Sequence, residues 1–211
     1  SDAAGGRRVT ESVIGAGAHD SLATTRARYY EANRFADVFA TATRVPETVA
    51  TEIAAIGGVA SVDTRIQKIA LADIADMAEP ASVALVSLPG YREPTLNRLV
   101  MRSGQAPDPE ADDEAIASEG FARAHGLAAG STIRVLINGR LRAVRITGTA
   151  LSPEYIYALG PGDLMPDDRR FGVLWMPQRA LAAAYDLESA FNNVAVKLTP
   201  GIPPAGVIDR I

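Results

Sequence analysis

The sequence predicts an α+β protein in which two strand–helix–strand (β-α-β) units flank a strand-rich middle block. A helix pattern separates two strand patterns over residues 34–71 and again over residues 171–198, and Asn138-Gly139 joins two short alternating strands between them. Two strands joined by a helix usually lie parallel in one sheet with a right-handed connection. We therefore expect both units to share one sheet, with their helices on a single face.

The first unit opens with an expected strand over Arg34–Thr43. A helix is expected to begin at Pro46, because proline suits a first helical turn. Apolar residues then recur one helical turn apart, and Gly57-Gly58 tolerates the positive φ that ends many helices. The second strand of the unit is expected over Val59–Leu71.

The second unit repeats this plan with a strand over Phe171–Met176, a helix beginning at Pro177 and a strand over Asn193–Leu198. The last stretch, Pro203–Ile211, begins another helical pattern. We expect this helix to continue beyond Ile211, so the chain is expected to be a piece of a longer protein.

The middle block has a different character, with short strands and tight turns. Strands are expected over Val83–Leu88 and Ala115–Ala117, with a short helix over Ser118–His125. The hairpin over Ile133–Ile146 is the clearest local prediction, because an Asn-Gly pair suits a two-residue type I′ turn. We interpret this block as a small β-rich subdomain inserted into an α/β one.

The expected organisation therefore has three parts. Residues 1–20 form a small, glycine-containing lead-in. Residues 21–90 and 160–211 form a discontinuous α/β subdomain, which begins with a short helix over Ser21–Asn33. Residues 91–159 form the inserted β-rich subdomain.

Composition excludes several classes of function. The chain has 21 basic and 25 acidic residues in 211, and no basic stripe of the kind that nucleic-acid binding requires, so no nucleic acid partner is expected. It contains no cysteine, which excludes disulfides, thiolate metal sites and a cysteine nucleophile. No apolar run reaches the length of about 18 residues that spans a bilayer.

Catalytic and cofactor motifs are missing from the sequence. His19 and His125 have no partner at metal-ligand spacing, and the glycine run at residues 13–18 lacks the third glycine of a dinucleotide site. Ser118 and Ser152 lie outside any nucleophile elbow, although a hydrolase with an unrecognised serine or aspartate site stays an alternative. We expect no catalytic, metal or cofactor residues, and the protein is not expected to be an enzyme.

One long loop, residues 152–170, combines prolines, glycines, tyrosines and opposite charges. Loops of this length are usually functional or anchored by their own side chains. Tyr155, Tyr157, Asp167 and Asp168 are therefore candidates for contact with a partner protein or cargo. In the alternative interpretation, the tyrosines pack beneath the loop as a small satellite core.

Six short stretches, spread in order over most of the chain, together form a specific set. They include an aromatic-rich segment, a Gly-Gly pair after a helix, a Ser-Pro-Glu-Tyr turn and an Asn-Asn pair within a strand. Their order is more specific than any single stretch. They are Tyr29–Phe39, Ile56–Val62, Glu119–Ala122, Leu127–Ser131, Ser152–Tyr155 and Phe191–Val194.

With these stretches the chain resembles the extracytoplasmic core domain of MacB-like and FtsX-like ABC transporter permeases. The resemblance implies a porter-like α/β subdomain with an inserted β-rich one, and it carries over no catalytic residue. It also implies that ATP is bound by a separate or fused cytoplasmic ABC ATPase, so this domain needs no cofactor of its own.

The resemblance further implies a location outside the bacterial cytoplasmic membrane, between two transmembrane helices that lie outside this chain. The implied partners are the cytoplasmic ATPase, a periplasmic adaptor, or a lipid, lipoprotein or peptide cargo. The implied role is cargo or partner handling and transmission of conformational change across the membrane. The main alternative is a stand-alone periplasmic binding module.

Overall fold

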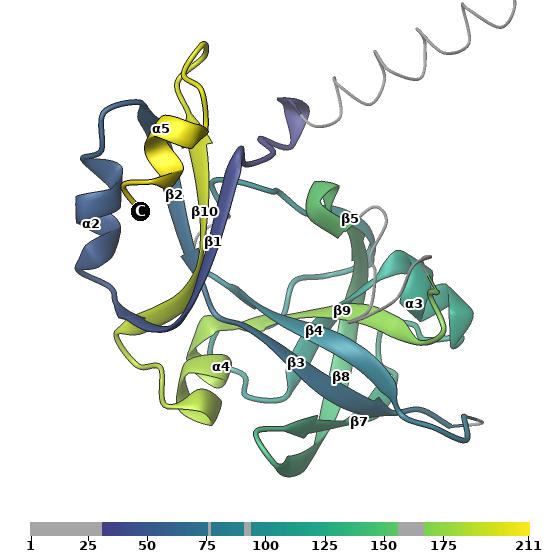
Figure 1. The fold of residues 1–211 in the computed structure, drawn as a ribbon. Coiled ribbons are helices and arrows are strands. Elements are labelled where there is room, and N and C mark those ends of the chain that lie inside the picture. The colour runs from purple at the N-terminus through teal and green to yellow at the C-terminus, as the bar shows by residue number, and fades with distance from the viewer. Residues whose placement is uncertain (1–30, 76, 91–93, 156–166) are drawn as a thin grey trace, which may run out of the picture.

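The computed structural model describes residues 31–75, 77–90, 94–155 and 167–211. The described chain is rich in strands, and its helices are short (Figure 1). The fold class is thus a mixed, sheet-rich α+β one. In chain order the elements are β1 (Val38–Pro46), α2 (Val49–Ala54), β2 (Val59–Arg65), β3 (Gln67–Asp73), β4 (Ala81–Leu88), β5 (Val100–Gly104), β6 (Glu114–Ser118), α3 (Glu119–Ala124), β7 (Thr132–Ile137), β8 (Arg140–Leu151), the 3₁₀ turn η1 (Pro153–Tyr155), β9 (Phe171–Pro177), α4 (Gln178–Tyr185), β10 (Ala190–Leu198) and α5 (Ala205–Ile208).

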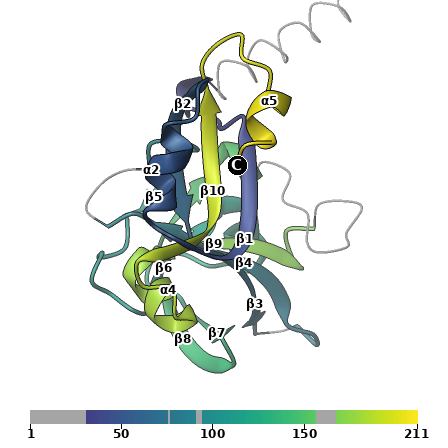
Figure 2. The same cartoon turned by 60° about the vertical axis from the view of Figure 1, so that its left-hand side comes forward.

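A three-stranded sheet, called the open sheet below, contains the first expected crossover. Its strand order is β1-β10-β2, and β10 is antiparallel to both neighbours. The two strands joined by α2 are therefore parallel within one sheet, as expected, but β10 lies between them. Ile53 of α2 and Val207 of α5 pack in the same cluster as Val196 of β10, so both helices cover one face (Figure 2).

The first strand lies later in the sequence than predicted. Arg34 has a positive φ of 51°, and β1 begins only at Val38. Pro46 ends this strand instead of opening the helix. The strand tolerates the proline because β1 is an edge strand, where a missing N–H need not cost a ladder hydrogen bond.

The prediction of a single strand over Val59–Leu71 is wrong, because the chain passes from one sheet to the other within it. The strands β2 and β3 are separated by Ile66 alone. The Ile66 N–H donates to Ser87 Oγ (2.8 Å), and the Ser87 N–H donates to the Ile66 carbonyl (2.9 Å). These bonds satisfy the buried backbone at the crossing point.

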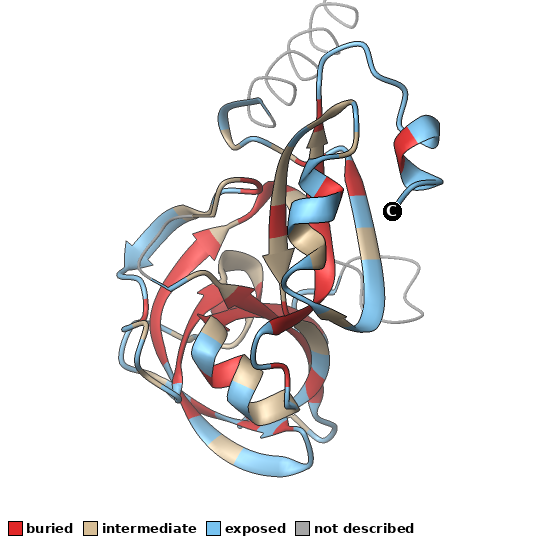
Figure 3. Ribbon diagram, turned by 90° about the vertical axis from the view of Figure 1, so that its left-hand side faces the viewer, coloured by how far each residue is buried: buried red, intermediate tan, exposed pale blue. Residues whose placement is uncertain are grey.

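The prediction that both crossover units share one sheet is also wrong. After α4 the chain turns at Asp186, which has a left-handed φ of 53°, and β10 enters the open sheet. In contrast, β9 lies between β6 and β4 in a seven-stranded sheet. Every residue of β9 is buried, which only a central strand covered on both faces can achieve (Figure 3).

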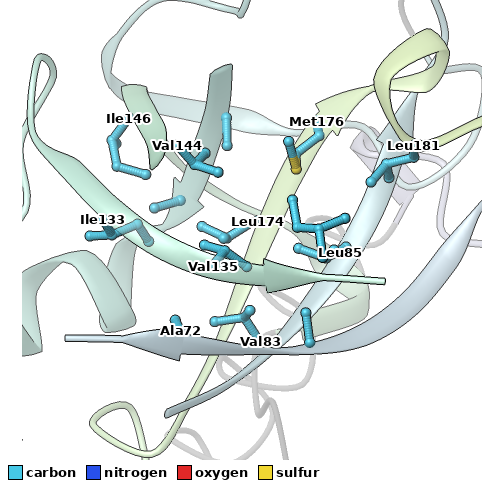
Figure 4. Packing of buried hydrophobic residues seen from close by; sticks show 14 of the residues in the cluster. Ala72, Val83, Leu85, Ile133, Val135, Val144, Ile146, Leu174, Met176 and Leu181 are labelled. Carbon is cyan, nitrogen blue, oxygen red and sulfur yellow. The ribbon is translucent and has the colours of Figure 1, made fainter. Parts of the chain in front are cut away.

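The seven-stranded sheet is called the closed sheet below, because its order β5-β8-β6-β9-β4-β3-β7 is completed by an extra pairing of β7 with β8. Its interior is aliphatic, and Figure 4 shows side chains from several strands meeting there. Phe121 of α3 and Leu181 of α4 join this core. Gly172 makes room for Phe121, since a Cβ there would lie 2.4 Å from the phenyl ring.

The hairpin within the closed sheet is confirmed in register and in turn. Ile133 pairs with Val144 and Val135 pairs with Arg142, so these side chains share a face as expected. Asn138 and Gly139 both have positive φ, at 45° and 76°. The turn therefore has the left-handed geometry that a type I′ turn needs.

The sheets divide the chain differently from the predicted subdomains. β3, β4 and β9 come from the segments assigned to the discontinuous subdomain (21–90 and 160–211), yet they pair into the closed sheet with strands of the expected insertion, 91–159. The physical reason is that an apolar strand buried on both faces needs hydrogen-bonded neighbours at both of its edges, and strands of residues 91–159 supply some of these neighbours. The lead-in and nearly all of the helix expected over 21–33 lie outside the described residues.

Candidate functional site

The two sheets meet at a buried group of polar side chains, called the polar junction below: Arg65, Asn97, Glu154 and Asn193. Arg65 is the last residue of β2, and Glu154 lies in η1, just after β8 of the closed sheet. The Arg65 guanidinium donates to Glu154 through Nη1 to Oε2 (2.5 Å) and through Nη2 to Oε1 (3.1 Å). This two-point ion pair fixes both distance and orientation between the sheets.

The two asparagines complete the polar junction. Asn193 Oδ1 of β10 accepts from Arg65 Nε (3.0 Å) and Nη2 (2.6 Å), which ties β10 to β2 by side chains as well as backbone. Asn97 Nδ2 donates to Glu154 Oε2 (3.0 Å), and Asn97 Oδ1 accepts from the Ala36 N–H (3.0 Å). Segments that are distant in sequence thus converge on one carboxylate.

Burial makes the ion pair of the polar junction different from a surface ion pair. The side chains of Arg65 and Glu154 are only 11% and 15% exposed. Burial alone would lower the pKa of Arg65, but the facing Glu154 carboxylate outweighs it, and the net effect raises that pKa. The guanidinium also lies over the Phe39 ring, 5.6 Å from its centroid. The ion pair is largely shielded from water.

Asn192 adds a second link between the sheets, one residue before Asn193. Its side-chain oxygen accepts from the Gln67 N–H (2.8 Å), and its amide donates to the Gln67 carbonyl (2.8 Å). The Asn192 side chain thereby makes the two hydrogen bonds to Gln67, at the start of β3, that the backbone of a neighbouring strand would make.

Tyr155, one of the predicted contact residues, packs inside the protein. Its ring meets Trp175 edge-on at 6.1 Å, and its hydroxyl accepts from Gln67 Nε2 (2.9 Å). Burial, and then the neighbouring Glu154, raise the pKa of Tyr155. This placement favours the alternative of a packed tyrosine, and a direct contact with a partner stays a prediction.

Of the other three predicted contact residues, the structure describes Asp167 and Asp168. Asp167 and Asp168 are exposed, and Asp168 lies 3.9 Å from Arg123. Tyr157 lies outside the described residues. Tyr155 and Asp168 do line the same cavity, of about 140 Å³, beside α3 and β9, so these two predicted residues are brought together.

The candidate catalytic side chains all have structural partners. Ser152 Oγ accepts from the Glu154 N–H (3.3 Å), and Ser118 Oγ accepts from the Val173 N–H (3.1 Å). His125 Nε2 lies 2.9 Å from the Arg169 carbonyl. No group of three or more metal-ligating side chains occurs in the part of the chain that the structure describes. These contacts give the hydrolase alternative no support, and the absence of catalysis stays a prediction.

Sequence reasoning predicted none of the four residues of the polar junction as site residues. Glu154 was noted only as part of Ser-Pro-Glu-Tyr, and Asn193 only as part of Phe-Asn-Asn-Val. A usable signal was present, because two adjacent asparagines inside an apolar strand are unfavourable unless their amides are hydrogen-bonded. Arg65 and Asn97 had no such signal.

A groove of about 580 Å³ lies beside β5. Five prolines line it together with Met101, which makes its wall apolar and conformationally stiff. The prolines are Pro89, Pro94, Pro107, Pro109 and Pro177.

Comparison with solved structures places this fold in a class. The chain superposes on the extracellular domain of the ABC-type transporter YknZ from Gram-positive bacteria with a TM-score of 0.50 and 13% identity, covering 78% of this chain and 79% of that one. The periplasmic region of MacB from Actinobacillus actinomycetemcomitans also matches, with a TM-score of 0.47 and 13% identity, covering 79% of this chain and 70% of that one. The chain therefore shares the fold of the YknZ extracellular domain.

The family follows from the sequence. The profile of the MacB-like periplasmic core domain matches residues 7–211, nearly the whole chain, and the chain belongs to this family. A search of curated proteins found no match. The resemblance noted from short stretches is therefore confirmed, and the protein is a periplasmic domain of a MacB-like ABC transporter permease. Within the described ranges, no helix is long and apolar enough to cross a membrane.

Proposed function

We propose that this domain transmits conformational change between the membrane part of the permease and the partner or cargo outside the membrane. The polar junction would be the coupling element. The observation that carries the proposal is the two-point ion pair between Arg65 of the open sheet and Glu154 beside the closed sheet.

The connectivity supports this role for side chains. The chain passes between the sheets at Ile66 and through the segment from α4 to β10, and among the described residues no strand of one sheet pairs with a strand of the other. Two covalent links without a shared ladder allow rotation of one body against the other unless side chains oppose it. The buried ion pair opposes it because separating its charges would leave each uncompensated.

The partners follow from the family. A cytoplasmic ABC ATPase would bind ATP and drive the membrane helices that anchor this domain, so the domain itself would need no cofactor. Cargo or an adaptor protein would meet the closed sheet, where the 580 Å³ groove and the 140 Å³ cavity lie. Tyr155 lines the 140 Å³ cavity and is the sequence neighbour of Glu154. Binding in this cavity would therefore change the contacts of the Arg65–Glu154 ion pair.

Spin-label distances in the full-length permease with its ATPase test this proposal. In a permease and ATPase from which other cysteines have been removed, Glu52→Cys on α2 and Thr132→Cys on β7 place one label on the open-sheet side and one on the closed sheet, since the 211-residue chain has no cysteine of its own. We expect the distance between the labels to differ between the nucleotide-free and ATP-bound states, and Glu154→Gln to abolish or broaden this difference.

Glu79→Gln is the matched control, because Glu79 forms an ion pair with Arg170 (2.8 Å) whose side chains are 75% and 63% exposed. This variant should behave like the wild type. A Glu154→Gln permease that keeps the full wild-type distance change would contradict the proposal.

A further inference from the structure

The strand β5 forms a free edge of the closed sheet. Among the described residues β5 pairs only with β8, whereas every other strand of this sheet has a neighbour on both sides. Met101, Arg102, Ser103 and Gly104 are all exposed, and because Gly104 has no side chain, it is the backbone that is open to water there. Backbone N–H and C=O groups along a free edge can hydrogen-bond to another extended chain.

The groove of about 580 Å³ follows this edge. Its wall includes Arg98 and Leu99, which precede β5, Met101 within the strand, and Ala106 and Pro107, which follow it. The groove therefore extends along the strand from one end to the other. A chain that paired with β5 would lie beside a preformed apolar wall.

Gly148 of β8 leaves room for Met101 in the wall of the groove. Gly148 is in register with Gly104 of β5 on one side and with Ile116 of β6 on the other. A Cβ at Gly148 would lie 2.9 Å from the Met101 methyl group, so Met101 lies over this glycine. Met101 is 40% exposed, and its unbranched thioether adapts readily to a bound group. The wall can therefore adjust to apolar side chains from a chain that lies along β5.

The groove carries one uncompensated positive charge. Arg98 is the only charged residue among the described residues that line it. The Arg98 side chain is exposed and has no ion-pair partner within the described part of the chain. In contrast, Arg102 of β5 is already paired with Glu119 (3.0 Å). Charge complementarity therefore favours a ligand that combines apolar side chains with a carboxylate.

We propose that an extended peptide segment of a partner or cargo protein binds along β5 as an added strand. Its aliphatic side chains would enter the groove, and one of its carboxylates would pair with Arg98. This inference rests on the proposed function in one respect, since that proposal brings cargo or an adaptor to this groove. A fatty acid would satisfy the groove and Arg98 but would leave the backbone edge of β5 unpaired.

The added ladder is short. β5 has only five residues, and its register with β8 shifts between Met101 and Ser103. Backbone hydrogen bonds alone would therefore bind weakly. The groove and Arg98 supply the specificity, as side-chain pockets do in other cases of strand addition.

Selection of random displayed peptides on the immobilised 211-residue chain tests this inference. We expect the selected peptides to combine aliphatic residues with Asp or Glu. N-methylation of a selected peptide, one residue at a time, should weaken binding at alternate residues, because only alternate N–H groups of an added strand face β5. A peptide held by its side chains alone would show no such alternation.

Two variants with matched controls test the groove and its charge. Met101→Gln should weaken peptide binding about tenfold or more, as is usual when a central contact is lost, whereas Ile208→Gln changes a 52% exposed residue of α5 and should bind like the wild type. Arg98→Glu should select Lys- or Arg-containing peptides instead. Arg210→Glu makes the same change at another exposed arginine and should still select acidic peptides. Circular dichroism spectra of all four variants should match the wild type.

Several results would overturn the inference. A library that yields no specific peptide would do so, and so would peptides that bind Met101→Gln as tightly as the wild type or that tolerate N-methylation at every residue. If only dodecanoate binds and Arg98→Glu abolishes its binding, the groove takes an anionic amphiphile and the inference is wrong. Self-association in sedimentation that Met101→Gln abolishes would assign the edge to a second copy of this chain.

The two proposals fail separately. Peptide binding is measured on the 211-residue chain and needs neither ATP nor the membrane helices, whereas the distance change is measured in the full-length permease with its ATPase. Loss of the nucleotide-dependent distance change alone would leave the binding inference standing. Failure of peptide selection alone would leave the transmission proposal standing.

Discussion

The closed and open sheets of this domain are stabilised in different ways. The closed sheet surrounds an aliphatic interior, and β9 is buried along its whole length. The open sheet has apolar residues on the face beneath α2 and α5, while its other face carries Arg65, Asn193 and Lys197. The first is a self-contained core, whereas the second depends on polar contacts with its surroundings.

This difference indicates that the two sheets have different mechanical roles. A sheet that closes on itself has few free edges and resists deformation. An open sheet attached through hydrogen bonds and one ion pair can occupy more than one orientation when those contacts change. Apolar packing should therefore dominate the stability of the closed sheet, and polar contacts should dominate the placement of the open sheet.

The largest expected effect is in the core of the closed sheet. Phe121→Ala should lower the free energy of unfolding by about 4 kcal/mol, because the lost ring leaves a cavity that the closed sheet cannot collapse to fill. Urea unfolding followed by circular dichroism measures this. A loss below about 1 kcal/mol would mean that the closed sheet is less tightly packed than the buried Phe121 indicates.

The next effect is at the polar junction. Glu154→Gln should lower the free energy of unfolding by about 3 kcal/mol, because it leaves the Arg65 charge buried without its partner. The double variant Arg65→Met/Glu154→Gln should be more stable than Glu154→Gln alone, since no uncompensated charge remains. Additive losses in the urea unfolding of the single and double variants would contradict the buried-pair interpretation.

A smaller, pH-dependent effect is expected at Tyr155. Burial raises its pKa above the ordinary value near 10, so the folded chain keeps the phenol proton where the unfolded chain releases it. The stability contributed by Tyr155 is therefore complete below about pH 10 and is lost as the pH rises towards the folded pKa.

Tyr155→Phe should therefore lower the free energy of unfolding by about 1 kcal/mol near neutral pH, because the hydrogen bond to Gln67 is lost. In alkali, the stability of this variant should fall less steeply with pH than that of the wild type. Tyr185, whose pKa burial also raises, is present in both proteins, so the difference between the two curves isolates Tyr155. Parallel curves above pH 10 would show that the Tyr155 phenol is not shielded from water.

The smallest effect is expected on the outer surface of the closed sheet. Leu141→Ser should change the free energy of unfolding by less than about 0.5 kcal/mol, because Leu141 is 55% exposed. Thermal unfolding measures this. A loss of several kcal/mol would show that Leu141 is part of the core.

Local features were predictable from the sequence, and long-range features were not. The hairpin at Asn138-Gly139 follows from turn preferences, which act over a few residues. The short helix after Ser118 was also predicted, although the Ser118 hydroxyl accepts from the Val173 N–H and does not cap the helix. The break at Ile66 could not be predicted, because it depends on Ser87 offering a hydrogen bond from a different strand. The assignment of β9 and β10 to different sheets depends on the same kind of distant contact.

The candidate site was only partly predictable for the same reason. Tyr155 was singled out by its loop, but its partners Gln67 and Trp175 come from other parts of the chain. Arg65 is an unremarkable residue at the end of a strand until the fold brings Glu154 to it. A buried ion pair between distant residues leaves no local pattern.

The most direct test of the account is whether the polar junction fixes the orientation of the two sheets. Residual dipolar couplings of backbone amides in the 211-residue chain report this orientation in solution. In the wild type and in Glu79→Gln, couplings from β4 and β9 and couplings from β1, β2 and β10 should fit one alignment tensor. In Glu154→Gln the two sets should require different tensors, whereas a single tensor that fits both sets would contradict the account.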